Sequence, residues 1–175
     1  MNELALQRAK AVRLMIFDVD GILTDGRLYF SGRGEELKAF NILDGHGLKM
    51  LRESGVETAI LTARQSPIVD RRAQELGITL VRQGVANKLA GFNELLALCK
   101  CTPPDAGYAG DDLVDLPVLT RCGFAASVPN ATEIVKSRAH LVTRANGGDG
   151  AVREVCEFIM HAQGTLQAAI APYLA

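Results

Sequence analysis

Short apolar runs alternate with amphipathic segments along most of the sequence, and this alternation limits the possible folds more than any other feature. Six runs are predicted to be strands: Val12–Phe17, Glu57–Leu61, Thr79–Val81, Gly107–Ala109, Phe124–Ala126 and His140–Leu141. The intervening segments include clear helices at 66–77, 87–99 and 150–160, and the "NATE" stretch from Asn130 reads as a capping box. Strands that alternate with helices form parallel sheets through right-handed crossovers. The sequence therefore predicts an α/β fold, with a parallel sheet covered on both faces.

One segment departs from this alternation. The stretch "RLYFSGRGEELKAF" at Arg27–Phe40 places two short apolar runs around a glycine-containing turn. This pattern predicts a β-hairpin inserted after the first strand.

Composition favours a globular chain with one domain over residues 1–175. The net charge is −1, so no basic surface for nucleic acid or an anionic membrane is expected. The first residues lack the apolar core of a signal peptide, so we expect a cytoplasmic location. The four cysteines and three histidines show no metal-ligand spacing.

Conspicuous polar residues follow the predicted strands. Asp18 and Asp20 end the first strand, Thr62 and Arg64 end the second, and Asp111, Asp112 and Asp115 follow the strand at 107–109. Lys88 begins a helix after the third strand. Ligands of open α/β sheets bind outside the carboxyl ends of the strands. These side chains are therefore expected to share one edge of the sheet.

This set suits phosphoryl transfer. Lys88 in a first helical turn opposes the helix dipole unless an anion binds there, and clustered carboxylates repel one another unless a hard cation such as Mg²⁺ is bound. For any single residue, a solvated loop carboxylate or an exposed lysine is an equally good interpretation. Taken together, the set predicts a metal and phosphate site.

The segments "DVDGILTDG", "LTAR", Lys88 and "GDDLVD" resemble, in order, the four motifs of the haloacid dehalogenase superfamily phosphatases. The resemblance implies that Asp18 is the nucleophile and that Asp20 is the general acid and base. It also implies Mg²⁺ bound by Asp18, the Asp20 backbone carbonyl and Asp111, with Thr62 and Lys88 on the phosphoryl oxygens. Asp115 is expected to orient Lys88, while Asp112 could be a supporting group or a plain loop carboxylate.

Many relatives carry a large cap domain, for which this sequence has no room. Only the hairpin and one helix precede the strand that ends before Thr62, and one helix and one strand separate Thr62 from Lys88. A capless site is open to water, so a neighbouring subunit is expected to cover it. The hairpin at 27–40 is the candidate assembly element; the alternative is a plain surface hairpin.

Nearly the whole chain resembles the 3-deoxy-D-manno-octulosonate 8-phosphate phosphatase family, through "GEELKAFNILDGHGLKML", "LTARQSPIVDRRAQELGI", "QGVANKL", "YAGDDLVDLPVL" and "GGDGAVREVCEFI". The resemblance implies a Rossmann-like, doubly wound fold without a cap, a homotetramer with active sites at subunit boundaries, and a role in lipopolysaccharide precursor synthesis. The substrate contacts it implies are Asp20, Asn41, Ile42, Leu43, Asp44, Gly45, Lys49, Arg64, Arg72 and Lys88.

Two alternatives stay open. Phosphatases of nine-carbon keto-sugar acid 9-phosphates tend to carry Glu at the position of Arg64 and Lys near Glu75, the opposite charges to those found here. A catalytically inert scaffold of the same fold is the second alternative. The chain departs from its relatives at Ala63, where glycine is usual, and at Asp149, where a basic residue is frequent; Asp149 could cap the following helix. The tail at 163–175 could reach a neighbour's site or be disordered.

Overall fold

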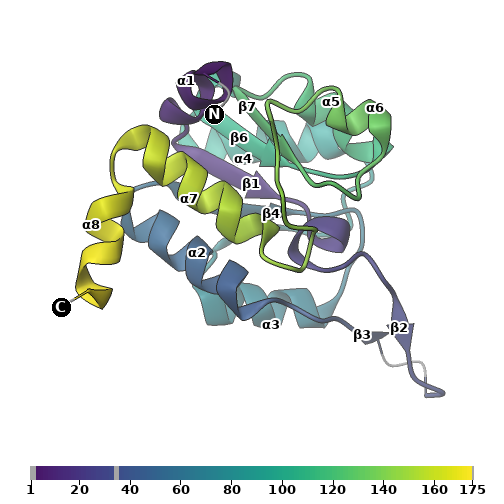
Figure 1. The fold of residues 1–175 in the computed structure, drawn as a ribbon. Helices are drawn as coiled ribbons and strands as arrows, with labels where there is room; N and C mark the ends of the chain where they lie inside the picture. Colours follow the sequence, from purple (N-terminus) through teal and green to yellow (C-terminus); the bar gives the residue numbers. More distant parts are fainter. Residues whose placement is uncertain (1–2, 34–35, 175) are drawn as a thin grey trace.

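The computed structural model describes residues 3–33 and 36–174. Its core is a six-stranded parallel sheet in the order β5-β4-β1-β6-β7-β8 (Figure 1). The strands are β1 (Leu14–Phe17), β4 (Glu57–Leu61), β5 (Leu80–Arg82), β6 (Ala106–Ala109), β7 (Phe124–Ser127) and β8 (Leu141–Val142). The predicted α/β fold with a doubly wound parallel sheet is confirmed.

Strand order reverses beside β1, and this reversal places the site. The chain runs from β1 outward through β4 to β5, and then returns to β6 on the other side of β1. Phe17 at the end of β1 is aligned with Ile60 of β4 and with Ala109 of β6. The residues that follow these three strands therefore meet at one edge of the sheet, at the switch point where such sheets bind ligands.

Helices cover both faces of the sheet. On one face α2 packs against α7 and α3, and α1 packs against α7; α4 and α5 contact each other on the opposite face (Figure 1). The helices are α1 (Glu3–Lys10), α2 (Ile42–Glu53), α3 (Pro67–Leu76), α4 (Lys88–Cys99), α5 (Leu116–Leu119), α6 (Glu133–Lys136), α7 (Ala151–Gln163) and α8 (Leu166–Ile170). None of these helices is both long and apolar enough to cross a membrane.

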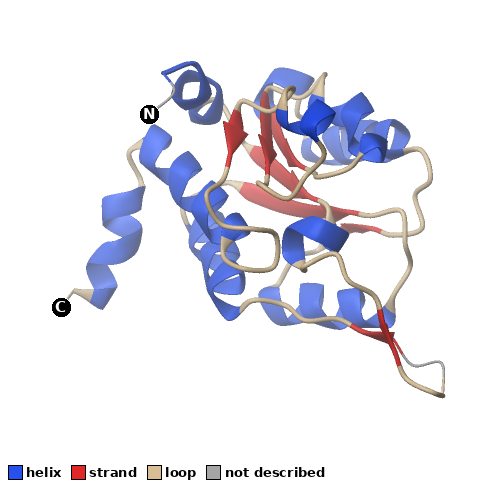
Figure 2. Cartoon of the chain, turned by 45° about the vertical axis from the view of Figure 1, so that its right-hand side comes forward, coloured by secondary structure: helices blue, strands red, loops and turns tan. Residues whose placement is uncertain are grey.

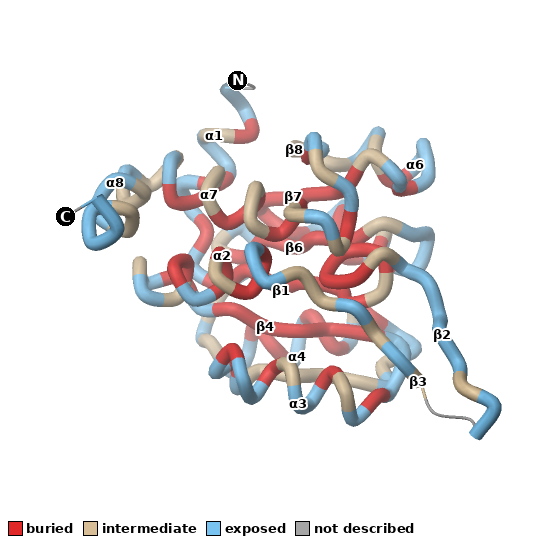
Figure 3. Tube along the Cα trace, turned by 60° about the horizontal axis from the view of Figure 1, so that its bottom comes forward, coloured by how far each residue is buried: buried red, intermediate tan, exposed pale blue. Residues whose placement is uncertain are grey.

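The core between these layers is formed by the apolar strands. Strands β1, β6 and β7 are buried along their whole length (Figure 3). Phe17, Phe92, Phe124 and Tyr108 are among the largest fully buried side chains. The continuous burial explains why these strands read as apolar runs rather than as alternating patterns.

The predicted hairpin is present and projects away from the sheet (Figure 2). Its strands β2 (Tyr29–Phe30) and β3 (Glu36–Leu37) pair antiparallel, while residues 34–35 of the predicted turn lie outside the described residues. Four apolar side chains on it are exposed: Leu28, Tyr29, Phe30 and Leu37. In the described part of the chain, only this hairpin, α2 and β4 lie between Asp20 and Thr62, so no cap is inserted there.

Two local expectations differ from the structure. Helix α6 begins at Glu133, after Thr132, and Asn130 instead accepts a hydrogen bond from the Gly147 backbone N–H at 3.4 Å. The capping box predicted from "NATE" is therefore wrong, because a tertiary contact takes the Asn130 side chain. Asp149 does not cap α7 either, since Gly150 holds the capping position with φ of 100°.

The tail is ordered over most of its length. Helix α8 and a short turn at Ala171–Tyr173 follow α7. The Tyr173 hydroxyl lies 2.8 Å from His46 Nε2 on α2. Residues 163–174 thus take up a defined structure, in which α8 packs against α7 and Tyr173 contacts α2.

Candidate active site

Asp18 is held at the carboxyl end of β1. Its backbone N–H donates to the Ala109 carbonyl of β6 at 3.0 Å, and the residue is only 6% exposed. The chain then makes an irregular turn, closed by the Thr24 N–H, which donates to the Val19 carbonyl at 3.0 Å. Gly21 within this turn has φ of 94°, a backbone conformation that favours glycine.

Lys88 joins the carboxylates of two strand ends. Its Nζ lies 2.8 Å from Asp18 Oδ2 and 2.6 Å from Asp115 Oδ1, and its side chain is 1% exposed. Burial lowers the pKa of Lys88, but the charges of Asp18 and Asp115 outweigh burial and raise it above its usual value. Lys88 is therefore a buried ammonium fixed beside the candidate nucleophile.

Asp115 fixes this lysine in turn. Tyr108 donates its hydroxyl proton to Asp115 Oδ1 at 2.6 Å, and its oxygen also accepts from Lys88 Nζ at 3.2 Å. The other carboxylate oxygen, Asp115 Oδ2, accepts from the backbone N–H groups of Asp111 and Asp112 at 3.0 and 3.1 Å. The expected contact between Asp115 and Lys88 is present. Asp112 is exposed and caps the turn at Leu113–Asp115.

The acidic cluster suits a divalent cation. Carboxylate oxygens of Asp18, Asp111 and Asp115 lie within 4.8 Å of one another. Burial and the neighbouring carboxylates raise the pKa of Asp18 to about 6 and that of Asp111 to about 7. Asp115 has both oxygens occupied by hydrogen bonds, whereas buried Asp111 Oδ1 has none. An orphaned carboxylate oxygen among like charges is the environment that a hard cation stabilises.

The Asp20 side chain contacts a cation of the hairpin and a cation of the loop after β4. Its carboxylate bonds to Lys38 Nζ, and Arg64 Nε lies 3.7 Å from Asp20 Oδ2. Glu36 contacts both cations, at 3.0 Å from Lys38 and 3.6 Å from Arg64. Burial raises the pKa of Glu36, but contacts with Lys38, Ser66 and Arg64 outweigh it and the pKa is lowered.

Thr62 lies at the end of β4 with its side chain buried. Its hydroxyl oxygen accepts weakly from the Arg64 N–H, at 3.4 Å. Lys100 is the one non-glycine residue with positive φ among residues 3–33 and 36–174. Ala63 therefore replaces the usual glycine without a left-handed backbone.

The segment at 41–45, which is predicted to contact substrate, makes structural contacts within the fold. The Asn41 side chain caps α2 by accepting from the Leu43 N–H at 2.8 Å. The Asp44 carboxylate is buried and accepts from the Arg153 N–H at 2.8 Å, in the first turn of α7. Ile42 and Leu43 are exposed.

Arg72 of α3 lies against this segment. Its guanidinium donates to the Asn41 carbonyl at 3.3 Å and lies 5.7 Å from the Phe40 ring centroid. A Cβ at Gly45 would lie 2.4 Å from Arg72 Nη2, so a larger residue there would displace the guanidinium from this position. Arg72 is thus joined to the predicted substrate segment.

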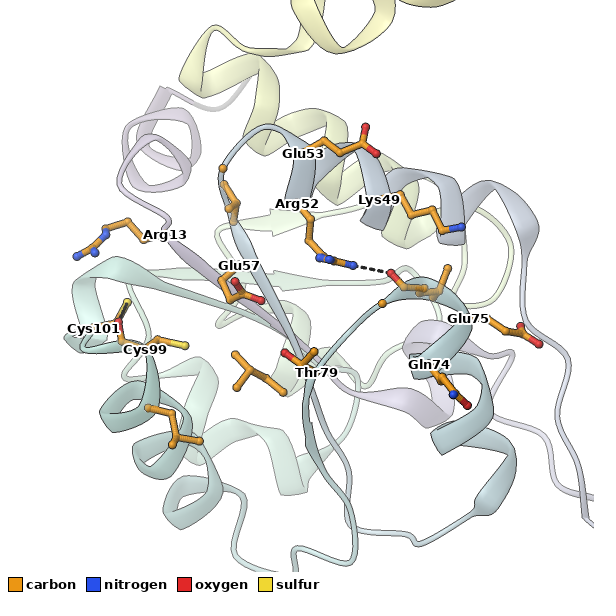
Figure 4. Close-up of a pocket in the computed structure, with 16 residues that line it drawn as sticks. Arg13, Lys49, Arg52, Glu53, Glu57, Gln74, Glu75, Thr79, Cys99 and Cys101 are labelled. Carbon is orange, nitrogen blue, oxygen red and sulfur yellow. Dashed lines mark hydrogen bonds between the residues drawn. The ribbon is translucent and has the colours of Figure 1, made fainter.

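Lys49 does not lie at the carboxyl-end edge of the sheet with the other predicted site residues. It lines a cavity of about 930 Å³ together with Arg13, Glu57 and Thr79, at the amino-terminal ends of the strands (Figure 4). Lys49, Arg52 and Glu53 all come from α2, and Arg52 points toward the strands whereas Glu53 points away from them (Figure 4). Among the predicted site residues, Lys49 alone lines that cavity.

Three residues that contact the predicted site residues are not predicted from the sequence. Lys38 and Glu36 belong to a segment that reads only as a hairpin strand, and Tyr108 reads as an apolar position of a buried strand. The "GEELKAF" stretch gave the one available signal, since two acids and a lysine follow a turn.

The "GGDG" loop closes the site through its backbone. A Cβ at Gly147 would lie 1.7 Å from the Gly21 carbonyl oxygen, and the Gly148 N–H donates to the Ile22 carbonyl at 3.0 Å. A Cβ at Gly21 would itself lie 2.1 Å from Asp111 Oδ2. These glycines let the loop, the turn after β1 and Asp111 pack in direct contact.

Comparison with known proteins agrees with this geometry. A family model of haloacid dehalogenase-like hydrolases matches residues 78–155. The 3-deoxy-D-manno-octulosonate 8-phosphate phosphatase of Yersinia pestis is 46% identical over 164 residues, which cover 94% of this chain and 88% of that protein.

Two crystal structures add a metal and a ligand to the comparison. The phosphatase of the same name from Moraxella catarrhalis, in complex with a magnesium ion, a phosphate ion and a KDO molecule, is 44% identical, with a TM-score of 0.96 and coverage of 99% of both chains. The cobalt-bound deoxy-D-mannose-octulosonate 8-phosphate phosphatase of Haemophilus influenzae is 38% identical, with a TM-score of 0.90 and coverage of 93% of this chain and 95% of that chain. The chain therefore belongs to the 3-deoxy-D-manno-octulosonate 8-phosphate phosphatase family of haloacid dehalogenase-like hydrolases.

Proposed function

We propose that this chain hydrolyses 3-deoxy-D-manno-octulosonate 8-phosphate to 3-deoxy-D-manno-octulosonate and phosphate, with Asp18 as the nucleophile. The observation that carries the proposal is the buried Asp18 carboxylate, held 2.8 Å from Lys88 beside the orphaned oxygen of Asp111. At one edge of the sheet, Asp18 offers a nucleophile, Lys88 offers a cation for the phosphate, and Asp111 offers a carboxylate for a metal ion. The sugar-acid phosphate is the substrate named for the family members to which the chain is similar.

The proposed reaction has two steps. In the first, an Asp18 oxygen bonds to phosphorus while the bond to the sugar oxygen breaks, and Asp20 gives its proton to that oxygen. In the second, Asp20 takes a proton from water as the water oxygen attacks phosphorus, which frees phosphate and restores Asp18. Lys88 and Thr62 hold the phosphoryl oxygens throughout.

The residues fit a divalent cation, and Mg²⁺ is the ion we propose. Asp18, Asp111 and the Asp20 backbone carbonyl would hold it, because Asp115 is already saturated by hydrogen bonds. Bound there, Mg²⁺ would neutralise the phosphate and the carboxylates that face it. The magnesium and cobalt ions in the two solved relatives support a divalent ion.

The substrate carboxylate and hydroxyls require further contacts. We propose that Arg64, Arg72, and the segment at 41–45 supply them, since Arg64 lies beside Asp20 and Arg72 bonds to Asn41. Lys49 lines the opposite cavity, so its proposed contact would be made to a neighbouring subunit's substrate.

We further propose a cytoplasmic homotetramer of single-domain chains, residues 1–175, with sites at the subunit boundaries. Its support is the projecting hairpin, on which Phe30 is 62% and Leu37 is 59% exposed. An open site needs a cover to exclude water, and a neighbouring subunit is the available one.

One kinetic comparison tests the substrate assignment. The purified chain with Mg²⁺ is assayed for phosphate release from the eight-carbon 8-phosphate and from nine-carbon keto-sugar acid 9-phosphates. Higher kcat/KM for the eight-carbon substrate is expected, because Arg64 offers a cation where the nine-carbon group tends to carry Glu. A preference for the nine-carbon substrates would overturn the assignment, and no release from either would favour the inert scaffold.

A further inference from the structure

The hairpin brings a buried cation to the candidate acid and base. Lys38 follows directly after β3, and its side chain is 1% exposed. Its Nζ bonds to Asp20 Oδ1 and lies 3.0 Å from Glu36 Oε1. Arg64 approaches the same two carboxylates at 3.7 and 3.6 Å, beyond hydrogen-bond distance. Lys38 is therefore the close partner of Asp20.

Because Lys38 is a buried cation, the groups that surround it determine what it can bind. An ammonium withdrawn from water is costly unless carboxylates or other acceptors surround it. Lys38 has two carboxylates, and Arg64, which is 45% exposed, completes a ring in which positive and negative groups alternate. Since both near neighbours are carboxylates, Lys38 is not free to bind a substrate anion. Each candidate catalytic carboxylate thus has its own buried lysine: Lys38 contacts Asp20, and Lys88 contacts Asp18.

A general acid must reach its target oxygen within hydrogen-bond distance, and a misplacement of about 1 Å can lower a rate by about 10²-fold. The Asp20 carboxylate can rotate about its side-chain bonds unless a partner fixes it. Lys38 engages Oδ1 and leaves Oδ2 without a contact shorter than 3.7 Å to a cation. Holding Oδ1 restricts rotation of the carboxylate about its side-chain bonds and leaves Oδ2 as the oxygen available for proton transfer.

We propose that Lys38 is a positioning residue, which holds the Asp20 carboxylate in the orientation required to protonate the leaving sugar oxygen and later to deprotonate water. Glu36 holds Lys38 in place. The proposal rests on the function proposed above and deepens it, because it assigns residues of the hairpin to the acid and base step. The proposal also makes catalysis depend on where the hairpin lies, because β3 contains Glu36 and is followed directly by Lys38.

The test compares Lys38→Met with the wild type on two phosphate esters. The sugar 8-phosphate has a basic leaving oxygen that needs a proton, whereas p-nitrophenyl phosphate has a leaving group that departs without one. For the sugar phosphate, we expect kcat to fall about 10²-fold with KM changed less than about 3-fold. For p-nitrophenyl phosphate, we expect a burst of one nitrophenolate per site, followed by slow turnover, because only the water step needs Asp20.

Further variants separate positioning from folding. Lys38→Arg keeps the charge and is expected to recover part of kcat, while Glu36→Gln is expected to lower kcat by about 10-fold in the same pattern. Arg27→Met removes an exposed hairpin cation that contacts Asp25, and it is expected to keep wild-type rates. If Lys38→Met is unfolded by circular dichroism, Lys38→Arg and Glu36→Gln decide the matter.

Several results would overturn the proposal. Unchanged kcat in folded Lys38→Met refutes positioning and, where Lys38→Met does not fold, so does wild-type kcat in Glu36→Gln. A raised KM at constant kcat identifies a substrate-binding residue instead, and loss of the nitrophenolate burst assigns Lys38 to the nucleophilic step. Failure of the wild type to release phosphate from the sugar ester refutes the proposed function, which is a different outcome.

Discussion

Asp111→Asn is expected to make the metal-free protein more stable at pH 8 while removing its response to Mg²⁺. Burial and the charges of Asp18 and Asp115 raise the pKa of Asp111 from 3.8 to about 7. Between these values the folded chain keeps a proton that the unfolded chain has lost, so stability falls as pH rises through this window. Above pH 7 the folded protein carries the full penalty of an ionised Asp111, and asparagine avoids it.

The magnitude follows from the pKa. Each pKa unit corresponds to about 1.4 kcal/mol, so the shift sets an upper bound of roughly 4 kcal/mol at pH 8. Asp111 is partly exposed, and solvent screening reduces this figure to about 1–3 kcal/mol. For a chain of this size, about 1 kcal/mol moves Tm by roughly 2–4 °C, so Tm in EDTA should rise by about 2–12 °C.

Thermal melts in EDTA at pH 5 and pH 8, repeated with excess Mg²⁺, provide the measurement. The gap between Asp111→Asn and wild type should widen from pH 5 to pH 8. Mg²⁺ should raise Tm in the wild type but not in Asp111→Asn, because a bound ligand stabilises the folded state. Asp112→Asn makes the same charge change at an exposed neighbour and should follow the wild type. An equal loss of Tm at both pH values in Asp111→Asn would refute the reasoning.

Three further predictions concern the nucleophile, its support and assembly. Asp18→Asn should abolish phosphate release while circular dichroism stays native; substantial residual turnover would exclude Asp18 as nucleophile. Tyr108→Phe removes a 2.6 Å hydrogen bond to Asp115 and should destabilise the protein by about 1.5–3 kcal/mol in urea unfolding, with kcat lowered less than about 10-fold. A larger loss of kcat without loss of stability would place Tyr108 in the chemistry itself. Phe30→Asp puts a charge on the exposed hairpin face, and sedimentation should show smaller assemblies than for the wild type. A stable, active wild-type monomer would contradict the proposed cover by a neighbouring subunit.

The sequence was sufficient for the sheet and for the residues at its edge. The carboxyl ends of parallel strands meet at one edge of the sheet, independently of the loops that follow them. The sequence alone therefore places Asp18, Thr62 and Lys88 together. Helix spacing similarly identified α3, α4 and α7. These predictions depend on periodicity and topology, which local sequence encodes.

Other parts depend on contacts between distant segments. The path of the hairpin past Asp20 is set by tertiary packing, so Lys38 could not be distinguished from an exposed strand lysine. Tyr108 lies in a buried strand, where the sequence pattern does not distinguish a tyrosine that bonds to Asp115 from an aromatic residue that only fills the core. Asn130 failed as a cap because its side chain bonds to the Gly147 backbone, a partner that lies far along the chain.

The contact of Gly147 and Gly148 with the turn after β1 has a consequence for how the protein folds. The two segments lie more than half the chain apart, so the turn that carries Asp20 gains these contacts only once the loop before α7 has packed against it. The entropy of closing so long a loop rises only slowly with length, but contacts of high sequence separation slow folding. We therefore expect this contact to form late in folding. The amide proton of Gly148 should become protected from exchange with solvent later than those of the central strands.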